Sequence, residues 1–436
     1  MATAKSTATI KRKVEREGVT KTFADALRET NYFAVNEGDN LRYYENGCYQ
    51  SEGDQHVLRQ TIQLSNQWRA SKMWSTKLER EVLTEIRRQA PKLWNNLSTD
   101  SINVRNGLLT IKTLKLEAHS PSFLSSIQLP VDYDKTARCP AWDRQIRETL
   151  PSDCQELIWE ILAWLILPER RIQQAILLLG DGANGKSTLL QAITNFLGQR
   201  NVSTVSLQQL DNDKFAAAEL YGKLANICSD LPGEHLAGTA MFKAIVSGDS
   251  VRAQRKYQEP FTFRPSCKLL FSANMLPQSN DTSYAFFKRW IIVPFDRRFT
   301  NGSAIPSYLI DKRLSSPTEL SGALNKALAA LPHLRQLTSF QQSPSMRVAW
   351  SQFQGISKEE TELAVWLDRT IRQDQNSVIS KITLYEKWKE YATQAGQAPQ
   401  SPRWFGVHLQ KLRPLISTVQ KRQNGRRIWS WQGIAF

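Results

Sequence analysis

The segment Leu177–Leu190, LLLGDGANGKSTLL, restricts the fold of this chain more than any other segment. Residues 180–187 fit the pattern G-x-x-x-x-G-K-[ST]. A short apolar run over 175–179 precedes the pattern, and an apolar-periodic stretch over 189–197 follows it. This context predicts a buried strand, a glycine-rich turn and a helix. Such a turn directs backbone N–H groups at phosphate oxygens, and the helix N-terminus adds the positive end of its dipole.

The residues of this loop predict a site for ATP or a close relative, with Mg²⁺ as its partner ion. Lys186 would reach the terminal phosphates, and the hydroxyl group of Ser187 would ligate the metal. The other residues expected to surround the phosphates are Gly180, Asp181, Gly182, Ala183, Asn184, Gly185 and Thr188. The alternative is a chance match to the bare pattern, and the flanking strand and helix argue against it.

Two later strand-like runs end in polar residues suited to nucleotide hydrolysis. The run LANICSD ends in Asp230, which we expect to act on the metal and on the attacking water. The run KLLFSAN ends in Asn274, which could orient the water or contact the γ-phosphate. Many nucleoside triphosphatases carry two adjacent acids at the first position, whereas here Ser229 precedes the aspartate. Either Asp230 serves both metal and water, or Glu234 assists it.

Composition indicates a polyanionic partner. The 436 residues include 57 Lys and Arg against 41 Asp and Glu, a net charge of +16. Nucleic acid fits this charge better than a membrane surface does. The longest apolar segment, 157–168, is too short to cross a bilayer, and the amino terminus has no apolar export segment. Five scattered cysteines without a C-x-x-C pair predict reduced thiols in a cytoplasmic protein.

Periodicity predicts an α/β protein in four parts. We expect a mixed α+β region over 1–120 with a flexible basic arm, a parallel-sheet core over 121–310, a linker over 311–350 and a separate module over 351–436. Within the first two parts, the expected elements are a hairpin over 41–50, a helix over 76–89, strands over 102–116, a connector over 121–140 and a buried helix over 154–167.

The final module carries ten Lys and Arg against two Asp and Glu from residue 381 onward. A cap at Ser401 followed by Pro402 predicts a helix start, and Asn424-Gly425 predicts a hairpin turn. The expected elements are helices over 382–392 and 401–412 and strands over 416–422 and 426–431. Two helices followed by a cationic hairpin are typical of a winged-helix DNA-binding domain.

In such a domain, Arg403 and Lys411 would face a DNA groove. The residues expected to contact phosphates from the hairpin are Lys421, Arg422, Arg426 and Arg427. Alternatively, these charges keep a small oligomerisation domain soluble.

The order of these elements resembles the superfamily 3 helicases. The similarity is closest to the helicase part of primase-helicases from satellite phages, poxviruses and mobile elements, and it covers roughly residues 100–300. It rests on GDGANGKST, the strand ending at Asp230, KAIVSGD with a basic hairpin behind it, the strand ending at Asn274, and KRW before Ile291. The segments NGLLTIKTLKLEAHSP and LPVDYDKTARCPAW resemble the lead-in region of the same group. The carboxy-terminal module resembles the tail module of that group.

This resemblance implies an AAA+-like core that assembles as a ring, usually a hexamer, with ATP between neighbouring subunits. Arg289 would be the arginine finger that reaches the γ-phosphate of the neighbour, with Lys288 as the rival. The hairpin residues implied to grip single-stranded DNA are Arg252, Arg255, Lys256 and Tyr257. Without the resemblance, this stretch reads equally well as an ordinary exposed hairpin, and Arg289 as a surface residue beside a strand.

The expected function is an ATP-dependent DNA helicase of a mobile element, phage or plasmid that unwinds duplex during replication initiation. Its partners would be single-stranded and duplex DNA, and a separate primase or initiator protein. The leading alternative is an ATP-gated DNA-binding regulator that assembles on DNA without unwinding it. A small-molecule kinase is a third possibility, which the basic tail disfavours.

Overall fold

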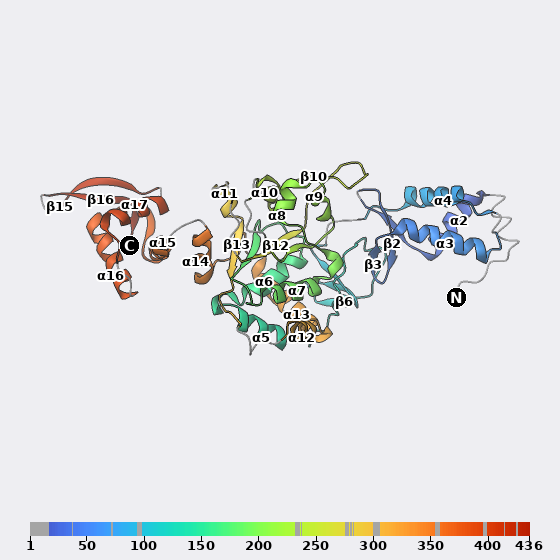
Figure 1. Cartoon of the computed structure of the whole chain (residues 1–436), viewed down its shortest axis with the longest axis horizontal. Coiled ribbons are helices and arrows are strands. Elements are labelled where there is room, and N and C mark those ends of the chain that lie inside the picture. The colour runs from blue at the N-terminus through green and yellow to red at the C-terminus, as the bar shows by residue number, and fades with distance from the viewer. Residues whose placement is uncertain are drawn as a thin grey trace. The chain divides into compact units, whose positions relative to one another are not determined.

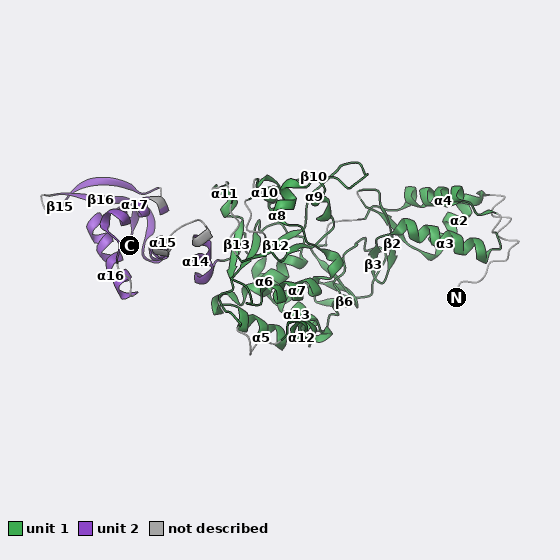
Figure 2. Cartoon of the chain, in the orientation of Figure 1, with its two compact units in different colours: residues 1–341 green, residues 342–436 purple. Residues whose placement is uncertain are grey.

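A computed structural model of the chain reveals two compact units, residues 1–341 and 342–436 (Figures 1 and 2). It describes residues 17–36, 38–70, 73–93, 98–231, 236, 238–274, 279, 281, 283–299, 306–353, 358–395, 399–413, 415–423 and 426–436. Of the described helices, none has the length and apolar character needed to cross a membrane. All five cysteines are buried and free.

The amino-terminal part of unit 1 packs three helices on an antiparallel sheet of order β1-β2-β3. Its elements are α2 (Val19–Thr30), β1 (Phe33–Val35), β2 (Leu41–Glu45), β3 (Cys48–Gln50), α3 (Gly53–Gln67) and α4 (Thr76–Gln89). Phe23, Val57 and Val82 lie on the three helices, and their fully buried side chains share one core. Of the arm expected over 1–21, residues 1–16 lie outside the described residues, and α2 already begins at Val19.

Both local predictions in this part are confirmed. The hairpin turns at Asn46 and Gly47, whose φ angles of 51° and 88° suit the tight turn that Asn-Gly favours. Helix α4 begins after Ser75, whose side chain accepts a hydrogen bond from the backbone N–H of Leu78. This bond satisfies one of the free N–H groups at the helix start.

A three-stranded meander and a coil connect this part to the central sheet. The strands are β4 (Ser101–Val104), β5 (Gly107–Thr110) and β6 (Lys115–Glu117). They fall within the expected strand segment 102–116 to within a residue or two, and the loop-rich connector follows them. Helix α5 (Pro140–Thr149) then leads to α6 (Leu157–Ile166), which is buried except at Glu160, as expected of a largely buried helix.

The centre of unit 1 is a five-stranded, fully parallel sheet of order β13-β7-β12-β9-β8. Its strands are β7 (Ala175–Leu179), β8 (Val202–Ser203), β9 (Ala225–Cys228), β12 (Lys268–Ala273) and β13 (Trp290–Pro294). The helices of the crossovers are α7 (Lys186–Leu197), α8 (Leu207–Asn212), α9 (Ala216–Glu219), α10 (Ala240–Ser247) and α11 (Tyr284–Phe287). The sheet confirms the α/β core predicted from the alternation of apolar runs and helical stretches.

The expected linker over 311–350 is corrected by the structure. Helix α12 (Ser307–Leu314) is followed by the 18-residue helix α13 (Pro317–Leu334), which packs along α6 within unit 1. Proline had suggested a break there. However, Pro317 stands in the first helical turn, where no N–H is needed, and Pro332 stands in the last.

In the described part of unit 2 there are four helices and an antiparallel sheet of order β14-β16-β15. Its elements are α14 (Pro344–Phe353), α15 (Lys358–Thr370), β14 (Arg372–Ser380), α16 (Lys381–Gln394), α17 (Pro402–Leu412), β15 (Ser417–Gln423) and β16 (Arg426–Ala435). The core includes Trp388, Phe405 and Trp431. The two predicted helices and two predicted strands are confirmed, whereas α15 and β14 were not predicted. The turn expected at Asn424-Gly425 lies outside the described residues.

Candidate nucleotide-binding site

The predicted phosphate loop, Asp230 and Asn274 all follow the carboxyl ends of strands in the central sheet. Strands β7 and β12 end in register, and the backbone N–H of Gly180 donates to the carbonyl of Ala273 (3.2 Å), directly before Asn274. On the other side of β12, the N–H of the residue after Asp230 donates to the carbonyl of Ser272 (2.8 Å). Because β12 lies between β7 and β9, Asn274 is placed between the loop and Asp230. The carboxyl edge of a parallel sheet is where ligands of such folds bind.

Two glycines of the loop are required by close packing. A Cβ atom on Gly180 would lie 2.2 Å from the side-chain nitrogen of Asn184 and 2.5 Å from the carbonyl oxygen of Phe295. Gly185 has a φ of 89°, and a Cβ atom there would lie 2.6 Å from Cγ2 of Thr149. Helix α5 and the end of β13 therefore hold the loop from both sides. The sequence pattern gave no signal for these supporting residues.

Lys186 is the best-defined side chain of the site. It is buried, and its Nζ donates to the carbonyl of Gly180, to Oδ1 of Asn184 (3.0 Å) and to Oδ1 of Asn274 (3.3 Å). These three acceptors match the three donors of an ammonium group. All three are uncharged oxygens, so the positive charge has no direct ionic partner among them.

The electrostatics of the site are set by burial and two acids. Burial lowers the pKa of Lys186, and the negative charges of Asp181 and Asp230 act in the opposite direction. Asp230 is therefore within electrostatic reach of the lysine. Ser187, in the first turn of α7, and Asp230 are both exposed, so their oxygens are accessible to a ligand.

The donors at this edge suit a magnesium ion carried by a nucleotide. Mg²⁺ that is bound to a nucleotide needs few ligands from the protein, because phosphates and water supply the others. The hydroxyl group of Ser187 and the carboxylate of Asp230 can provide them. Across the described ranges, no three His, Cys, Asp or Glu side chains gather as a separate metal cluster. Glu234, the candidate helper of Asp230, lies outside the described residues.

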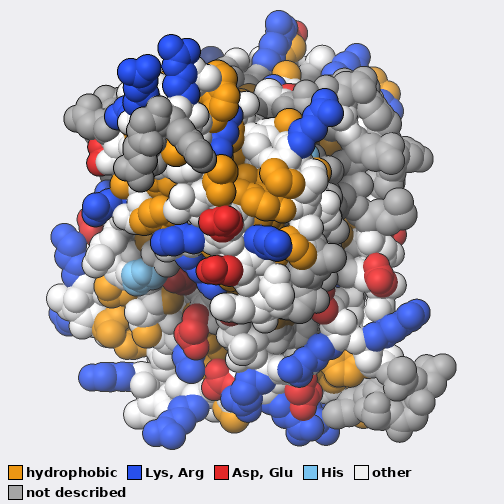
Figure 3. Space-filling view, turned by 90° about the vertical axis from the view of Figure 1, so that its left-hand side faces the viewer, with side chains coloured by type: hydrophobic (Ala, Val, Ile, Leu, Met, Phe, Trp, Pro, Cys, Tyr) orange, Lys and Arg blue, Asp and Glu red, His pale blue; other side chains and the backbone are white. Residues whose placement is uncertain are grey.

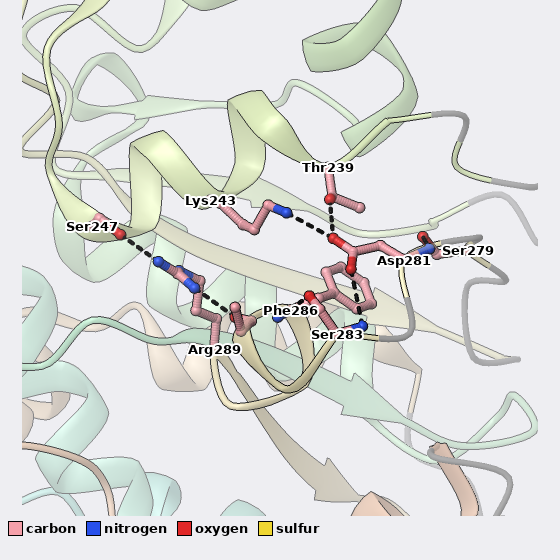
Figure 4. Close-up of polar contacts among 9 residues, drawn as sticks. Thr239, Lys243, Ser247, Ser279, Asp281, Ser283, Phe286 and Arg289 are labelled. Carbon is pink, nitrogen blue, oxygen red and sulfur yellow. Dashed lines mark hydrogen bonds and ion pairs between the residues drawn. The ribbon is translucent and has the colours of Figure 1, made fainter.

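Arg289 lies at the amino ends of the strands, opposite the ends that carry the phosphate loop. Its backbone carbonyl accepts from the N–H of Ala175, the first residue of β7 (2.7 Å). Its guanidinium group donates to Oγ of Ser247 (2.8 Å) and to the carbonyl of Ala285, as Figure 4 shows. The five residues of β7 span about 16 Å, so Arg289 is not brought near Lys186 of its own chain. Lys288, its rival, is exposed beside it.

A polar cluster around Asp281 holds helix α10 against the segment that precedes α11 (Figure 4). Lys243 forms an ion pair with Asp281 (2.8 Å), Thr239 donates to the same carboxylate, and the N–H of Ser283 donates to its other oxygen (3.0 Å). Burial by itself would raise the pKa of Asp281, but the hydrogen bonds from Lys243, Ser283 and Thr239 hold it well below its ordinary value. No sequence motif marks this cluster, because Asp281 is about forty residues from Thr239 and Lys243.

The predicted DNA hairpin forms from β10 (Val251–Ala253) and β11 (Phe261–Phe263). Arg252, Lys256 and Tyr257 are exposed, and Tyr257 is 92% exposed with a φ of 63°. Arg255 is only half-exposed. Its guanidinium carbon lies 5.4 Å from the ring centre of Tyr221 and 4.9 Å from that of Phe261. Arg255 thus points toward the base of the hairpin.

In unit 2, several predicted DNA contacts are exposed cations. Arg403 lies on α17, and Lys421, Arg422 and Arg427 lie on the β15–β16 hairpin, where Arg422 stands directly opposite Arg427. Like charges in such a pair destabilise a sheet, so an anionic ligand would relieve a cost that is already present. Lys and Arg side chains recur across the face in Figure 3. The side chains of Lys411 and Arg426 lie outside the described residues.

Two family models match parts of the chain. The first, "D5 N terminal like", matches residues 15–151, and the second, "Family of unknown function (DUF5906)", matches residues 178–289. The second range begins within β7 and ends at Arg289, so it contains the loop, Asp230, the hairpin and Asn274. Each model covers less than half of the 436 residues.

One curated relative and several solved structures were also found. A protein of Acanthamoeba polyphaga mimivirus named "Putative helicase" is 25% identical over 156 residues, which is 34% of this chain. The match spans only 16% of that viral protein. An apo structure of the NrS-1 C terminal region has a TM-score of 0.48 at 11% identity, covering 94% of this chain and 98% of that chain. A second structure of that region has a TM-score of 0.46 with the same identity and coverage.

Proposed function

We propose that this protein is an ATP-dependent DNA helicase of a mobile element, phage or plasmid. The observation that carries the proposal is the convergence of Lys186, Asn274 and Asp230 around a phosphate loop at the carboxyl edge of a parallel sheet. A distant relation to a viral protein named as a helicase supports it. The basic hairpin and the basic unit 2 provide surfaces for DNA.

The chain's own residues divide the hydrolytic work. Lys186 would exchange its contacts with neutral loop oxygens for the terminal phosphates, because an ammonium group binds an anion more strongly than a neutral carbonyl. Asn274, now bonded to that lysine, would be left to orient the attacking water. Asp230 would polarise the water. A magnesium ion held by Ser187 and Asp230 would neutralise charge on the phosphates.

Hydrolysis would require a neighbouring subunit. Arg289 lies at the end of its own sheet that is remote from the phosphate loop. We therefore place it at the nucleotide of the adjacent protomer in a ring, most simply a hexamer. A cation there stabilises the charge that develops on the transferred phosphate and is worth about 10³ to 10⁵ in rate in related chemistry. Release of its bond to Ser247, the last residue of α10, would accompany that contact.

The DNA would contact two surfaces. In the AAA+-like core, the hairpin with Arg252, Lys256 and Tyr257 would hold single-stranded DNA by phosphate contacts and base stacking. Unit 2 has the helix-strand-helix-helix-hairpin order of a winged helix, so α17 would enter a groove and the β15–β16 hairpin would contact the backbone. A separate primase or initiator would complete replication initiation.

A strand-displacement assay on a forked duplex tests this function. The wild type should separate the strands only with ATP and Mg²⁺, and Lys186→Ala should reduce displacement by at least about 10²-fold while the melting temperature stays close to that of the wild type. DNA-stimulated ATP hydrolysis with no strand separation would instead identify the ATP-gated regulator. Hydrolysis that persists in Lys186→Ala would remove the loop from the active site.

A further inference from the structure

Four cations converge where the amino-terminal sheet meets the base of the hairpin. We call them the junction cations: Arg42 on β2, Arg200 after α7, Lys223 before β9 and Arg255 in the hairpin. They come from three separate parts of the chain. The hairpin and the amino-terminal sheet lie beside each other in Figure 1.

Arg200 and Lys223 are held in place by neutral groups. The guanidinium group of Arg200 donates to Oε1 of Gln50 (2.6 Å) and to Sγ of Cys48 (3.0 Å), both on β3. Nζ of Lys223 donates to the backbone carbonyl of Arg200 (2.6 Å). These bonds tie the central sheet to the amino-terminal sheet while leaving both positive charges uncompensated.

Arg255 extends from the hairpin toward the amino-terminal part. The rings of Tyr221 and Phe261 support its guanidinium group, and its Nη1 lies 3.1 Å from where a Cβ atom on Gly38 would stand. Aromatic faces attract a guanidinium group and fix its plane, but they leave its N–H donors free to bind an anion. Arg255 is therefore already oriented beside the loop between β1 and β2.

Arg42, like Lys223 and Arg255, is half-buried. Its Nε is buried and has no hydrogen-bond partner within the described part of the chain. Burial lowers the pKa of Arg42, Tyr221 and Cys48 act in the opposite direction, and the positive charges of Arg255 and Arg200 lower it further. A guanidinium group that is desolvated, close to other cations and short of an acceptor carries a free-energy cost that an anion would relieve.

No ion pair joins a junction cation to a carboxylate among the residues that the structure describes. The carboxylate of Glu219, which is exposed, acts electrostatically on Lys223. The site is also distinct from the nucleotide site. Arg200 follows the far end of α7, whose 12 residues span about 18 Å from the phosphate loop, and Lys223 precedes β9 while Asp230 follows it.

We propose that the junction cations bind the phosphodiester backbone of the single DNA strand held by the hairpin. This inference rests on the proposed helicase function and extends the DNA path onto the amino-terminal part of unit 1. The guanidinium groups of Arg42 and Arg255 have the planar fork of N–H donors that matches the paired oxygens of a phosphate. The exposed ring of Tyr257, on the same hairpin, can stack on an unpaired base, which favours single-stranded over duplex DNA.

The test is the salt dependence of single-stranded DNA binding by the full chain. Loss of one phosphate contact lowers the slope of log K against log salt by about 0.7 for a single strand. We expect Arg42→Gln to lower the slope by about that amount and to weaken binding about five-fold at moderate salt, while Arg42→Lys retains the slope. Arg59→Gln, which removes an exposed arginine on α3 that is not a junction cation, should match the wild type.

Three outcomes decide the matter. Unchanged slope and affinity in Arg42→Gln, with binding weakened in the hairpin variant Lys256→Ala, would overturn this inference and leave the helicase function standing. Loss confined to a duplex of equal length would also overturn it. If neither variant affects single-stranded DNA, the proposed DNA path itself fails. Should Arg42→Gln not fold, Arg200→Gln removes an exposed member of the group and is expected to give the same loss of slope.

Discussion

At Asp281, burial and hydrogen bonding act in opposite directions on one carboxylate, and hydrogen bonding prevails. The group accepts from Lys243, Thr239 and Ser283 and so joins α10 to the segment that leads to Arg289 (Figure 4). Sequence motifs do not predict such a contact, because Thr239 and Lys243 are separated from Asp281 by about forty residues and fit no known pattern. Lys186 is the converse case, since a local sequence motif is enough to single it out.

Asp281→Asn should destabilise unit 1 by about 1–2 kcal/mol at neutral pH, because it removes a charge-assisted hydrogen-bond acceptor. The pKa of Asp281 is lowered in the folded protein, so this stabilisation is complete above about pH 4, the ordinary aspartate range, and declines as the pH falls below it. Urea unfolding at pH 7 and pH 3 measures the difference. Asp100→Asn, which breaks an exposed ion pair with Lys112, is the control. An equal loss at both pH values, or an equal loss in the control, would contradict this role.

At the scale of elements, the hairpin is the part most directly open to test. Tyr257→Ala should weaken single-stranded DNA binding by about 1–3 kcal/mol, because it removes a stacking platform, and Tyr257→Trp should preserve it. Fluorescence anisotropy with a labelled oligonucleotide gives both affinities. Tyr308→Ala removes another exposed tyrosine, 67% accessible on α12, and should bind normally. Equal affinity of the wild type and Tyr257→Ala would exclude stacking at this position.

Elements with strong local signals were predictable from sequence. The span 76–89 was correct to the residue because its apolar period and its Ser75 cap agree. The segment that contains helix α13 resembles a linker because of its prolines, although Pro317 and Pro332 both stand where a helix tolerates them. Strand β14 was missed because its sequence, RQDQNSVIS, lacks alternation, and its pairing with β16 supplies what local propensity does not.

The same contrast holds for the candidate site. The phosphate loop, Asp230 and Asn274 meet as expected, because strands of one parallel sheet direct their carboxyl ends to one edge. The supports of the loop, Thr149 and Phe295, depend on packing between distant segments and leave no pattern in the sequence. The bond between Arg289 and Ser247 is of the same kind.

For the whole molecule, the polarity of the sheet is the decisive feature. In this parallel sheet the phosphate loop lies at the carboxyl ends of the strands and Arg289 lies at their amino ends. One copy of the chain therefore cannot bring both to a single nucleotide. A ring of identical subunits solves this problem, because a head-to-tail interface joins opposite surfaces of neighbours. We therefore propose that ATP is cleaved between copies of the chain.

Mixing two inactive variants tests this claim most directly. Lys186→Ala and Arg289→Ala should each hydrolyse ATP at least about 10²-fold more slowly than the wild type in the presence of single-stranded DNA. In an equal mixture, about a quarter of the interfaces pair an intact Lys186 with an intact neighbouring Arg289, so turnover should recover to about that fraction of the wild-type rate. A mixture no more active than its components, or an Arg289→Ala protein with full activity as a monomer, would contradict the account.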